Sequence, residues 1–242
     1  MRALTASNLL SVWERASRQP PVERALLLLG AACPERTAEE LAQLPIGQRD
    51  SLLVALREST FGSQLVSRLL CQKCGERLEL ALKISDIRVV RETENAAALT
   101  VNADGFEVLF RLPNSDDIRA VTVAVEADDD GEQILLRRCV LRVTKDDVEQ
   151  SVDQLPRTMI DLVSADMAEA DPQCIPLSLA CAACSHESQV GFDIVSYFWT
   201  ELNAWANRIL REVHLLASRY GWRESDILAM SPWRRQCYLE MV

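Results

Sequence analysis

Four of the eight cysteines are spaced so that they could bind one metal ion together. They form two Cys-x-x-Cys pairs, Cys71 with Cys74 and Cys181 with Cys184. A turn of this spacing lets two thiolates converge on an ion, and two such turns complete a tetrahedral site. Each pair follows a short apolar run and precedes alternating polar and apolar residues, which is typical of a strand. The sequence therefore predicts one structural zinc site.

The two pairs are unusually far apart, because 106 residues separate Cys74 from Cys181. Typical zinc ribbons have shorter gaps, so we expect a ribbon split by an inserted region. Gly75 suits the left-handed conformation that commonly closes such a turn. Four thiolates would close the coordination shell, which favours a structural site over a catalytic one. His186 could replace one ligand, although a solvated position beside the site is the simpler interpretation.

A Cys-x-x-Cys pair is also found in thiol–disulfide enzymes, so a redox role stays an alternative. The isolated cysteines stand among apolar neighbours and are most simply small buried side chains. These are Cys33, Cys139, Cys174 and Cys237.

Little else in the sequence could carry out a reaction. The two histidines, His186 and His214, limit acid–base chemistry. No glycine-rich phosphate loop and no nucleophile elbow are present. The run Asp128–Asp130 lacks the ligand spacing of a calcium loop and is best interpreted as a solvated turn. We therefore expect no catalytic residues and no cofactor-binding residues, and we expect the protein not to be an enzyme.

Composition excludes some partners. No apolar run reaches the roughly 18 residues that a membrane span needs, and the N-terminus lacks the order of a signal peptide, so a soluble cytoplasmic protein is expected. A net charge of −10 disfavours nucleic acid. Residues 85–175 hold 20 acidic and 9 basic side chains, whereas the rest of the chain is close to neutral. This acidic segment is either a solvated surface or a face for a basic partner.

The predicted elements divide the chain into four ranges. Apolar spacing predicts helices over 7–19, 25–32 and 48–58, with a short helix after Thr37. In the insertion, Asn102–Gly105 predicts a hairpin, followed by helices from Ser115, over 133–143 and within 146–170. The expected domains are a helical unit at 1–60, a split zinc ribbon at 61–87 and 173–193, an acidic hairpin-and-helix domain at 88–172, and a helical arm at 194–242. The expected fold is α+β and mainly helical.

The C-terminal arm is the most regular part. Apolar residues recur every three or four positions from Ile194 to Leu216, which predicts one long amphipathic helix. A short helix over 222–230 and a last helix after Ser231-Pro232 should follow. Core packing is the default role for the tryptophans of this arm. The alternative is a protein interface, since exposed aromatic and arginine side chains favour protein contacts. Its candidate residues are Trp222, Arg223, Trp233, Arg234 and Arg235.

Two segments resemble a known family. The tail at 220–240 and the strand-then-helix segment Phe110–Ile118 look like those of T-even-phage-type baseplate proteins. That group has relatives in contractile injection systems and among tail-assembly chaperones. The two cysteine turns are similar to those of its zinc-bearing members. The resemblance covers most of the chain, loosely at residues 1–60 and most specifically at 220–240.

The resemblance implies a structural or chaperone-like component of a contractile tail baseplate that binds other baseplate or tail proteins. It further implies a location in the cytoplasm or in a phage-tail-like particle. No nucleic-acid, membrane or small-molecule partner is expected. The alternative is a free-standing zinc-ribbon adaptor or regulatory protein.

Overall fold

A computed structural model describes residues 1–87, 98–171 and 175–242. Its contacts define two compact units, which are Met1–Arg36 with Ile194–Val242, and Thr37–Asp193. The first unit is helical, and the second contains the three sheets of the described residues. The fold is therefore α+β and mainly helical, as predicted. The four predicted domain ranges stay a prediction, and their limits at 88, 172 and 173 fall outside the described residues.

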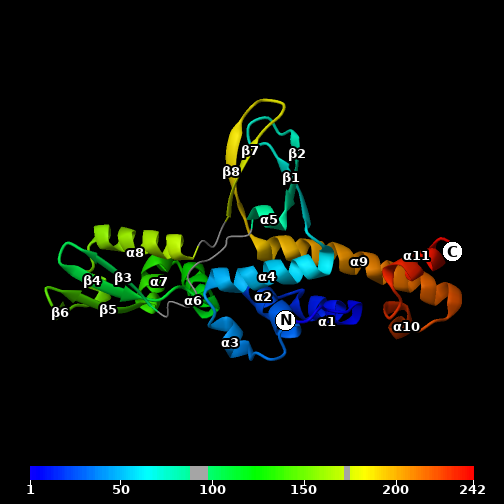
Figure 1. Ribbon diagram of the computed structural model, residues 1–242, viewed down its shortest axis with the longest axis horizontal. Helices are drawn as coiled ribbons and strands as arrows, with labels where there is room; N and C mark the ends of the chain where they lie inside the picture. Colours follow the sequence, from blue (N-terminus) through cyan, green and yellow to red (C-terminus); the bar gives the residue numbers. More distant parts are fainter. Residues whose placement is uncertain (88–97, 172–174) are drawn as a thin grey trace. The chain divides into compact units, whose positions relative to one another are not determined.

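The first unit is built around the long helix α9, Ile194–Tyr220 (Figure 1). Its buried residues recur every three or four positions along one face, as the sequence predicted. Thr5 caps helix α1 through a reciprocal capping box with Asn8. The helices that accompany α9 are α1 (Ala6–Ala16), α2 (Pro21–Ala32), α10 (Glu224–Leu228) and α11 (Pro232–Leu239).

The second unit begins with helices α3 (Ala38–Ala42) and α4 (Ile46–Phe61). Thr37 and Glu40 form a capping box, which confirms the predicted helix start. Helix α4 has a longer extent than the predicted 48–58. Among the described residues, no helix is both long and apolar enough to cross a lipid bilayer.

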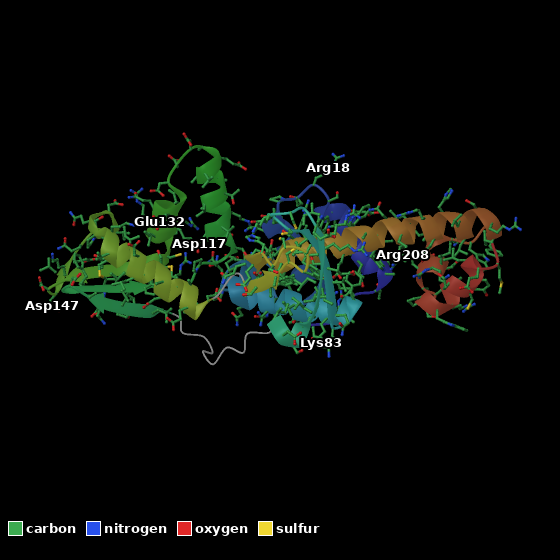
Figure 2. All side chains as sticks on the ribbon, turned by 90° about the horizontal axis from the view of Figure 1, so that it is seen from above. Arg18, Lys83, Asp117, Glu132, Asp147 and Arg208 are labelled. Carbon is green, nitrogen blue, oxygen red and sulfur yellow. The ribbon has the colours of Figure 1, made fainter. Side chains whose placement is uncertain are left out.

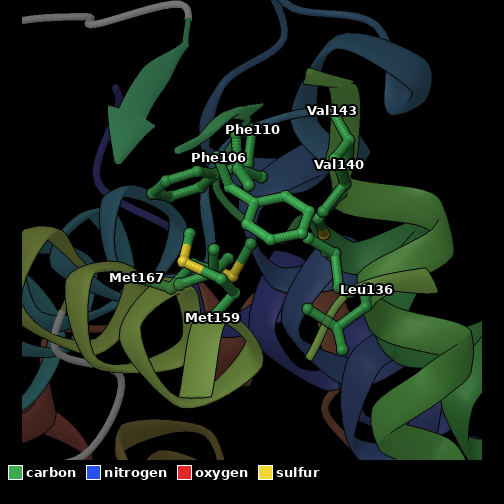
Figure 3. Packing of buried hydrophobic residues seen from close by; sticks show 11 residues of the cluster. Phe106, Phe110, Leu136, Val140, Val143, Met159 and Met167 are labelled. Carbon is green, nitrogen blue, oxygen red and sulfur yellow. The ribbon is translucent and has the colours of Figure 1, made fainter. Parts of the chain in front are cut away.

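A four-stranded antiparallel sheet follows in the order β3-β4-β5-β6. The predicted hairpin is confirmed, because β3 and β4 are joined by Asp104 and Gly105, both in the left-handed conformation that such a two-residue turn requires. One face of the sheet packs on helices, and Phe106, Phe110 and Met159 lie in that core (Figure 3). The strands and helices are β3 (Leu99–Ala103), β4 (Phe106–Phe110), α6 (Ser115–Glu126), α7 (Gly131–Cys139), β5 (Val140–Lys145), β6 (Val148–Glu149), η1 (Val152–Gln154) and α8 (Arg157–Ala170).

One local prediction in this region is wrong. The predicted helix over 133–143 ends at Cys139, and the next residues form strand β5. Pairing of β5 with β4 buries Val140 and Val143, while Leu141 is exposed at a register shift. The segment 146–170 contains a helix, as predicted, although it starts with a turn and strand β6 and the helix begins at Arg157. Helix α6 begins at Ser115, as predicted, and Asn114 caps it, because the Asn114 side chain accepts hydrogen bonds from the N–H groups of Asp116 and Asp117.

Candidate metal centre

Two β-hairpins position the cysteine pairs. Strand β1 (Gln64–Leu70) pairs with β2 (Arg77–Lys83), and β7 (Ile175–Ala180) pairs with β8 (Glu187–Phe192). The last paired residues, Leu70 with Arg77 and Ala180 with Glu187, leave six residues in each turn. Short helix α5 (Ile84–Ile87) follows the first hairpin. The tips of the two hairpins meet, although they come from distant parts of the sequence (Figure 1).

Both turns have the same backbone hydrogen bonds. In the first, the N–H of Cys71 donates to the carbonyl of Glu76 at 2.8 Å, and the N–H of Gly75 donates to the carbonyl of Cys71 at 2.9 Å. In the second, the N–H of Cys181 donates to the carbonyl of His186 at 2.9 Å, and the N–H of Ser185 donates to the carbonyl of Cys181 at 2.8 Å. The matching contexts of the two pairs in the sequence thus correspond to two matching turns.

The residue after each second cysteine has a left-handed backbone. Gly75 has φ of 74°, as expected from its type, and Ser185 has φ of 54° at the equivalent position. This conformation costs a residue with a Cβ atom roughly 1–2 kcal/mol, a cost that glycine avoids. The second turn is therefore the more strained of the two.

The four sulfur atoms form one cluster. The Sγ atoms of Cys71 and Cys184 lie 3.7 Å apart, as do those of Cys74 and Cys181, and all four lie within 4.8 Å of one another. A tetrahedral zinc site with bonds of about 2.3 Å would separate its sulfurs by about 3.8 Å. Within the described part of the chain, this is the one group of at least three histidine, cysteine or acidic residues that could hold a metal ion. The donor set and its geometry fit such an ion.

The protein stabilises the thiolate of Cys71 better than that of Cys184. Backbone N–H groups of Cys74 and Lys73 lower the pKa of the Cys71 thiol to about 6. At Cys184 the His186 N–H favours the thiolate, but the Cys74 thiol and burial outweigh it and raise the pKa to about 12. Four neighbouring thiols do not all ionise unaided, because each negative charge opposes the next. A divalent cation at the centre would supply the missing positive charge.

The other candidate residues named from the sequence lie outside the cysteine cluster. His186 is half-buried and is not part of the cluster that could hold a metal. Cys33 and Cys139 are buried, as predicted, whereas Cys237 is half-buried. Cys174 lies outside the described residues. The predicted turn at Asp128–Asp130 is present, and the Asp130 side chain caps helix α7.

The candidate interface residues of the arm have different surroundings. Trp222 is half-buried and stacks on Tyr220, with ring centroids 4.4 Å apart. Arg235 is buried, and its guanidinium donates to a carboxylate oxygen of Glu212 at 2.7 Å. Arg223 and Arg234 are exposed. Trp233 is the most exposed aromatic side chain among the described residues, at 78%.

One buried charge was not anticipated from the sequence. Asp117 in α6 is fully buried and accepts hydrogen bonds from Arg111 at 2.9 Å and from Arg138 at 2.7 Å (Figure 2 labels Asp117). Although burial acts in the opposite direction, Arg111, the Asn114 N–H and Arg138 lower the pKa of Asp117 to about 2. This network fixes the strand-then-helix segment Phe110–Ile118. Its only signal in the sequence was the acidic pair at the start of the predicted helix.

The family comparison agrees with the resemblance seen in the sequence. The family model described as T4 bacteriophage base plate protein matches residues 7–199, which is most of the chain and includes all four cysteines of the cluster. The match does not extend to the tail at 220–240. Searches of the curated proteins and of the solved structures gave no match. On the extent of the family match, the chain belongs to the T4 bacteriophage base plate protein family.

Proposed function

We propose that this chain is a structural or assembly component of a contractile tail baseplate and that a zinc ion bound by its four clustered cysteines stabilises it. The observation that carries the proposal is the convergence of Cys71, Cys74, Cys181 and Cys184 in a member of a baseplate family. No catalytic role is proposed, because a four-thiolate shell leaves no coordination position for a substrate.

The chemistry of the donors favours zinc. Thiolates are soft ligands, and a tetrahedral set of four sulfurs is typical of structural zinc or of iron–sulfur sites. When bound, zinc would stabilise four thiolates and contribute its binding energy to folding. The N–H groups that favour the Cys71 thiolate would help to keep this ligand in its charged form.

The hairpins need such a connection. An isolated two-stranded hairpin is marginally stable in water. In each hairpin, one face carries apolar side chains that are only half-buried, such as Leu78 and Leu80 in the first, and Leu179 and Val190 in the second. Because packing alone covers these faces incompletely, a metal that holds both tips would keep the two hairpins in one arrangement.

The proposed partners are other baseplate or tail proteins, and the proposed location is a phage-tail-like particle or the cytoplasm in which it assembles. The arm residues Trp222, Arg223, Trp233, Arg234 and Arg235 stay the candidate contact surface, with exposed Trp233 as the best placed of them. Nucleic acid, membrane and small-molecule partners are not proposed. The acidic net charge also makes a nucleic-acid adaptor the weaker alternative.

The proposal is tested by metal analysis and by co-purification. The purified chain should contain one zinc per molecule, measured by elemental mass spectrometry, and Cys181→Ser should lose it while Cys237→Ser keeps it. Co-expressed with other contractile-tail proteins, the tagged wild-type chain should retain at least one of them. A metal-free wild-type protein with reversibly oxidised Cys71 and Cys74 would instead favour the redox alternative. Failure to retain any tail protein would contradict the baseplate role.

A further inference from the structure

The four-stranded sheet has two edge strands that differ in their protection. Strand β6 is two residues long and contains Glu149, and both a short length and a charge discourage another strand from pairing. Strand β3 has five residues, Leu99–Ala103, with neither a charge nor a proline, and its register with β4 is regular. An edge of this kind is a template for another extended segment. The β3 edge therefore lacks the features that prevent an additional strand from pairing.

The backbone of β3 determines which groups such a strand would meet. A two-residue turn makes the flanking pair, Ala103 with Phe106, exchange both hydrogen bonds of the ladder. In an antiparallel ladder these pairs alternate with pairs that make no hydrogen bonds to each other, so the N–H and C=O groups of Thr100 and Asn102 point away from β4. Among the described residues, no other backbone group bonds to them. An extended segment is the partner that can pair with all of these groups together.

The two faces of β3 determine which side chains the added strand would carry. Leu99, Val101 and Ala103 are half-buried and pack against the core between the sheet and its helices. Thr100 and Asn102 are exposed on the opposite face. A strand beside β3 would continue both faces. It therefore needs apolar residues at every second position, towards the helices, and polar residues between them.

The charge around this edge favours a basic segment. Residues 98–171 hold 17 acidic and 7 basic side chains, a net charge of −10. A cavity of about 400 Å³ lies at the turn that ends β3, and its charged lining residues are all acidic: Asp104, Glu107, Asp146 and Asp147 (Figure 2 labels Asp147). Within the described part of the chain, Glu107 pairs with Arg142, whereas the three aspartates make no ion pair. A second copy of the chain would bring the same negative charge, so the complement of this edge is a basic segment of another protein.

We propose that the β3 edge binds an extended segment of a partner protein in which apolar residues alternate with lysine or arginine. The inference rests on the proposed protein-binding function and specifies the chemistry of a partner. The segment pairs with the backbone of Thr100 and Asn102, and its basic side chains lie on the exposed face, on the side of the acidic turns at Asp104 and Asp146. Backbone hydrogen bonds supply affinity, and the alternating pattern with its charges supplies specificity.

A defined peptide tests this inference on the zinc-loaded, full-length chain. The probe is a fluorescein-labelled peptide of alternating valine and lysine, and the matched peptide has glutamate in place of lysine. Fluorescence anisotropy should show that the lysine probe binds at least about tenfold more tightly than the glutamate peptide. A lysine probe methylated on alternate backbone nitrogens, along the edge that pairs, should lose its binding, because it keeps its charge but cannot donate to β3.

Hydrogen exchange locates the binding site. The amides of Thr100 and Asn102 should exchange rapidly in the free chain, because no described backbone group accepts a hydrogen bond from them. The lysine probe should slow their exchange. Protection of both amides in the free chain at every concentration would show that the chain itself covers this edge and would overturn the proposal. Protection that rises with chain concentration, without the probe, would identify a second copy as the occupant and would also overturn it.

Two variants of Asn102 separate backbone pairing from side-chain contacts. Asn102→Pro removes an outward N–H that the ladder with β4 does not use, so the hairpin should stay folded while probe binding weakens at least about tenfold. Asn102→Ala keeps this N–H and should bind the probe as the wild type does. Thermal unfolding shows whether both variants are folded, and the methylated probe tests backbone pairing without any substitution in the chain.

Charge removal gives an independent readout. Asp146→Asn with Asp147→Asn removes two charges at positions with a left-handed backbone, which asparagine tolerates, and should weaken probe binding about threefold at low salt. Asp128→Asn with Asp129→Asn removes two charges from the loop after α6 and should have a smaller effect. Equal binding of the lysine and glutamate peptides, or binding that backbone methylation leaves unchanged, would overturn the proposal. A chain that ignores the probe but still retains a tail protein would refute strand addition alone and leave the baseplate function intact.

Discussion

The Sγ atom of Cys71 lies 3.7 Å from that of Cys184, although 113 positions separate the two residues in the chain. The distance is typical of two ligands of one tetrahedral metal and too long for a disulfide, whose sulfurs lie about 2.05 Å apart. Closing so long a loop costs conformational entropy. A metal ion bound at the ends of this loop would offset part of that cost through its binding energy.

Replacing one cysteine of the cluster should affect metal and stability together. Cys181 is buried, and Cys181→Ser should lower bound zinc well below one per molecule and destabilise the second unit by several kcal/mol, because metal binding is coupled to folding. Metal content and thermal unfolding check this. Cys237→Ser is the matched control, since it removes a thiol far from the cluster in sequence. Equal losses in both variants would argue against a metal-specific effect.

Removing the metal should loosen the hairpins before the rest of the second unit. After chelation, amide hydrogen exchange should accelerate in β1, β2, β7 and β8, because each hairpin is then a two-stranded element with a half-exposed apolar face. The sheet β3-β4-β5-β6 has its own core around Phe110 and Met159 and should keep its protection. Uniform acceleration across all three sheets would show that the metal supports the whole unit.

The two turns should respond oppositely to glycine exchange. Gly75→Ala places a Cβ atom on a residue with φ of 74° and should destabilise by about 1 kcal/mol, although no atom lies within 4 Å of the new Cβ. Ser185→Gly relieves the same strain in the second turn and should be neutral or stabilising by less than about 1 kcal/mol. Chemical denaturation of the zinc-loaded variants measures both. A costly Ser185→Gly exchange would mean that the serine side chain has a role beyond its backbone conformation.

Buried Asp117 should make the protein sensitive to acid. Its folded pKa of about 2 lies below the ordinary value of 3.8, so its stabilising contribution is complete above about pH 4 and is lost as the pH falls towards 2. Asp117→Asn should cost about 3 kcal/mol at neutral pH, because Arg111 and Arg138 would lose a charged partner. Asp153→Asn breaks an exposed pair with Arg137 and should cost less than about 1 kcal/mol. Unfolding free energies at pH 7 and pH 3 provide the comparison.

Asp50 should act in the opposite direction at a higher pH. Burial raises the pKa of this carboxyl to about 6, despite the opposing effect of Arg49. The Asp50 carboxyl binds its proton more tightly in the folded state than in the unfolded one. The contribution of Asp50 to stability is therefore complete below about pH 4 and is lost as the pH rises through 6. Between pH 4 and pH 7, the unfolding free energy of the wild type should therefore fall relative to that of Asp50→Asn. A constant difference over that range would exclude the raised pKa.

Several elements could be predicted from local patterns because local interactions form them. Thr37 with Glu40 and Ser231 with Pro232 specify helix starts through side chains within one turn. The spacing from Ile194 to Leu216 specifies a buried helix face. The cysteine cluster was predictable for a related reason, since each pair lies within one short turn. That the two turns share one site was inferred from their matching surroundings.

The sequence by itself determined the two cysteine turns, the long helix α9 and the hairpin at Asp104-Gly105, because spacing and backbone preference act over a few residues. Only the tertiary structure decided that residues 140–145 form a strand, since pairing with β4 outweighs the helical pattern that precedes them. It also decided which arm residues are accessible: Arg235 is buried against Glu212, and Trp233 is exposed. Burial depends on neighbours that are distant in the chain, and no local pattern encodes them.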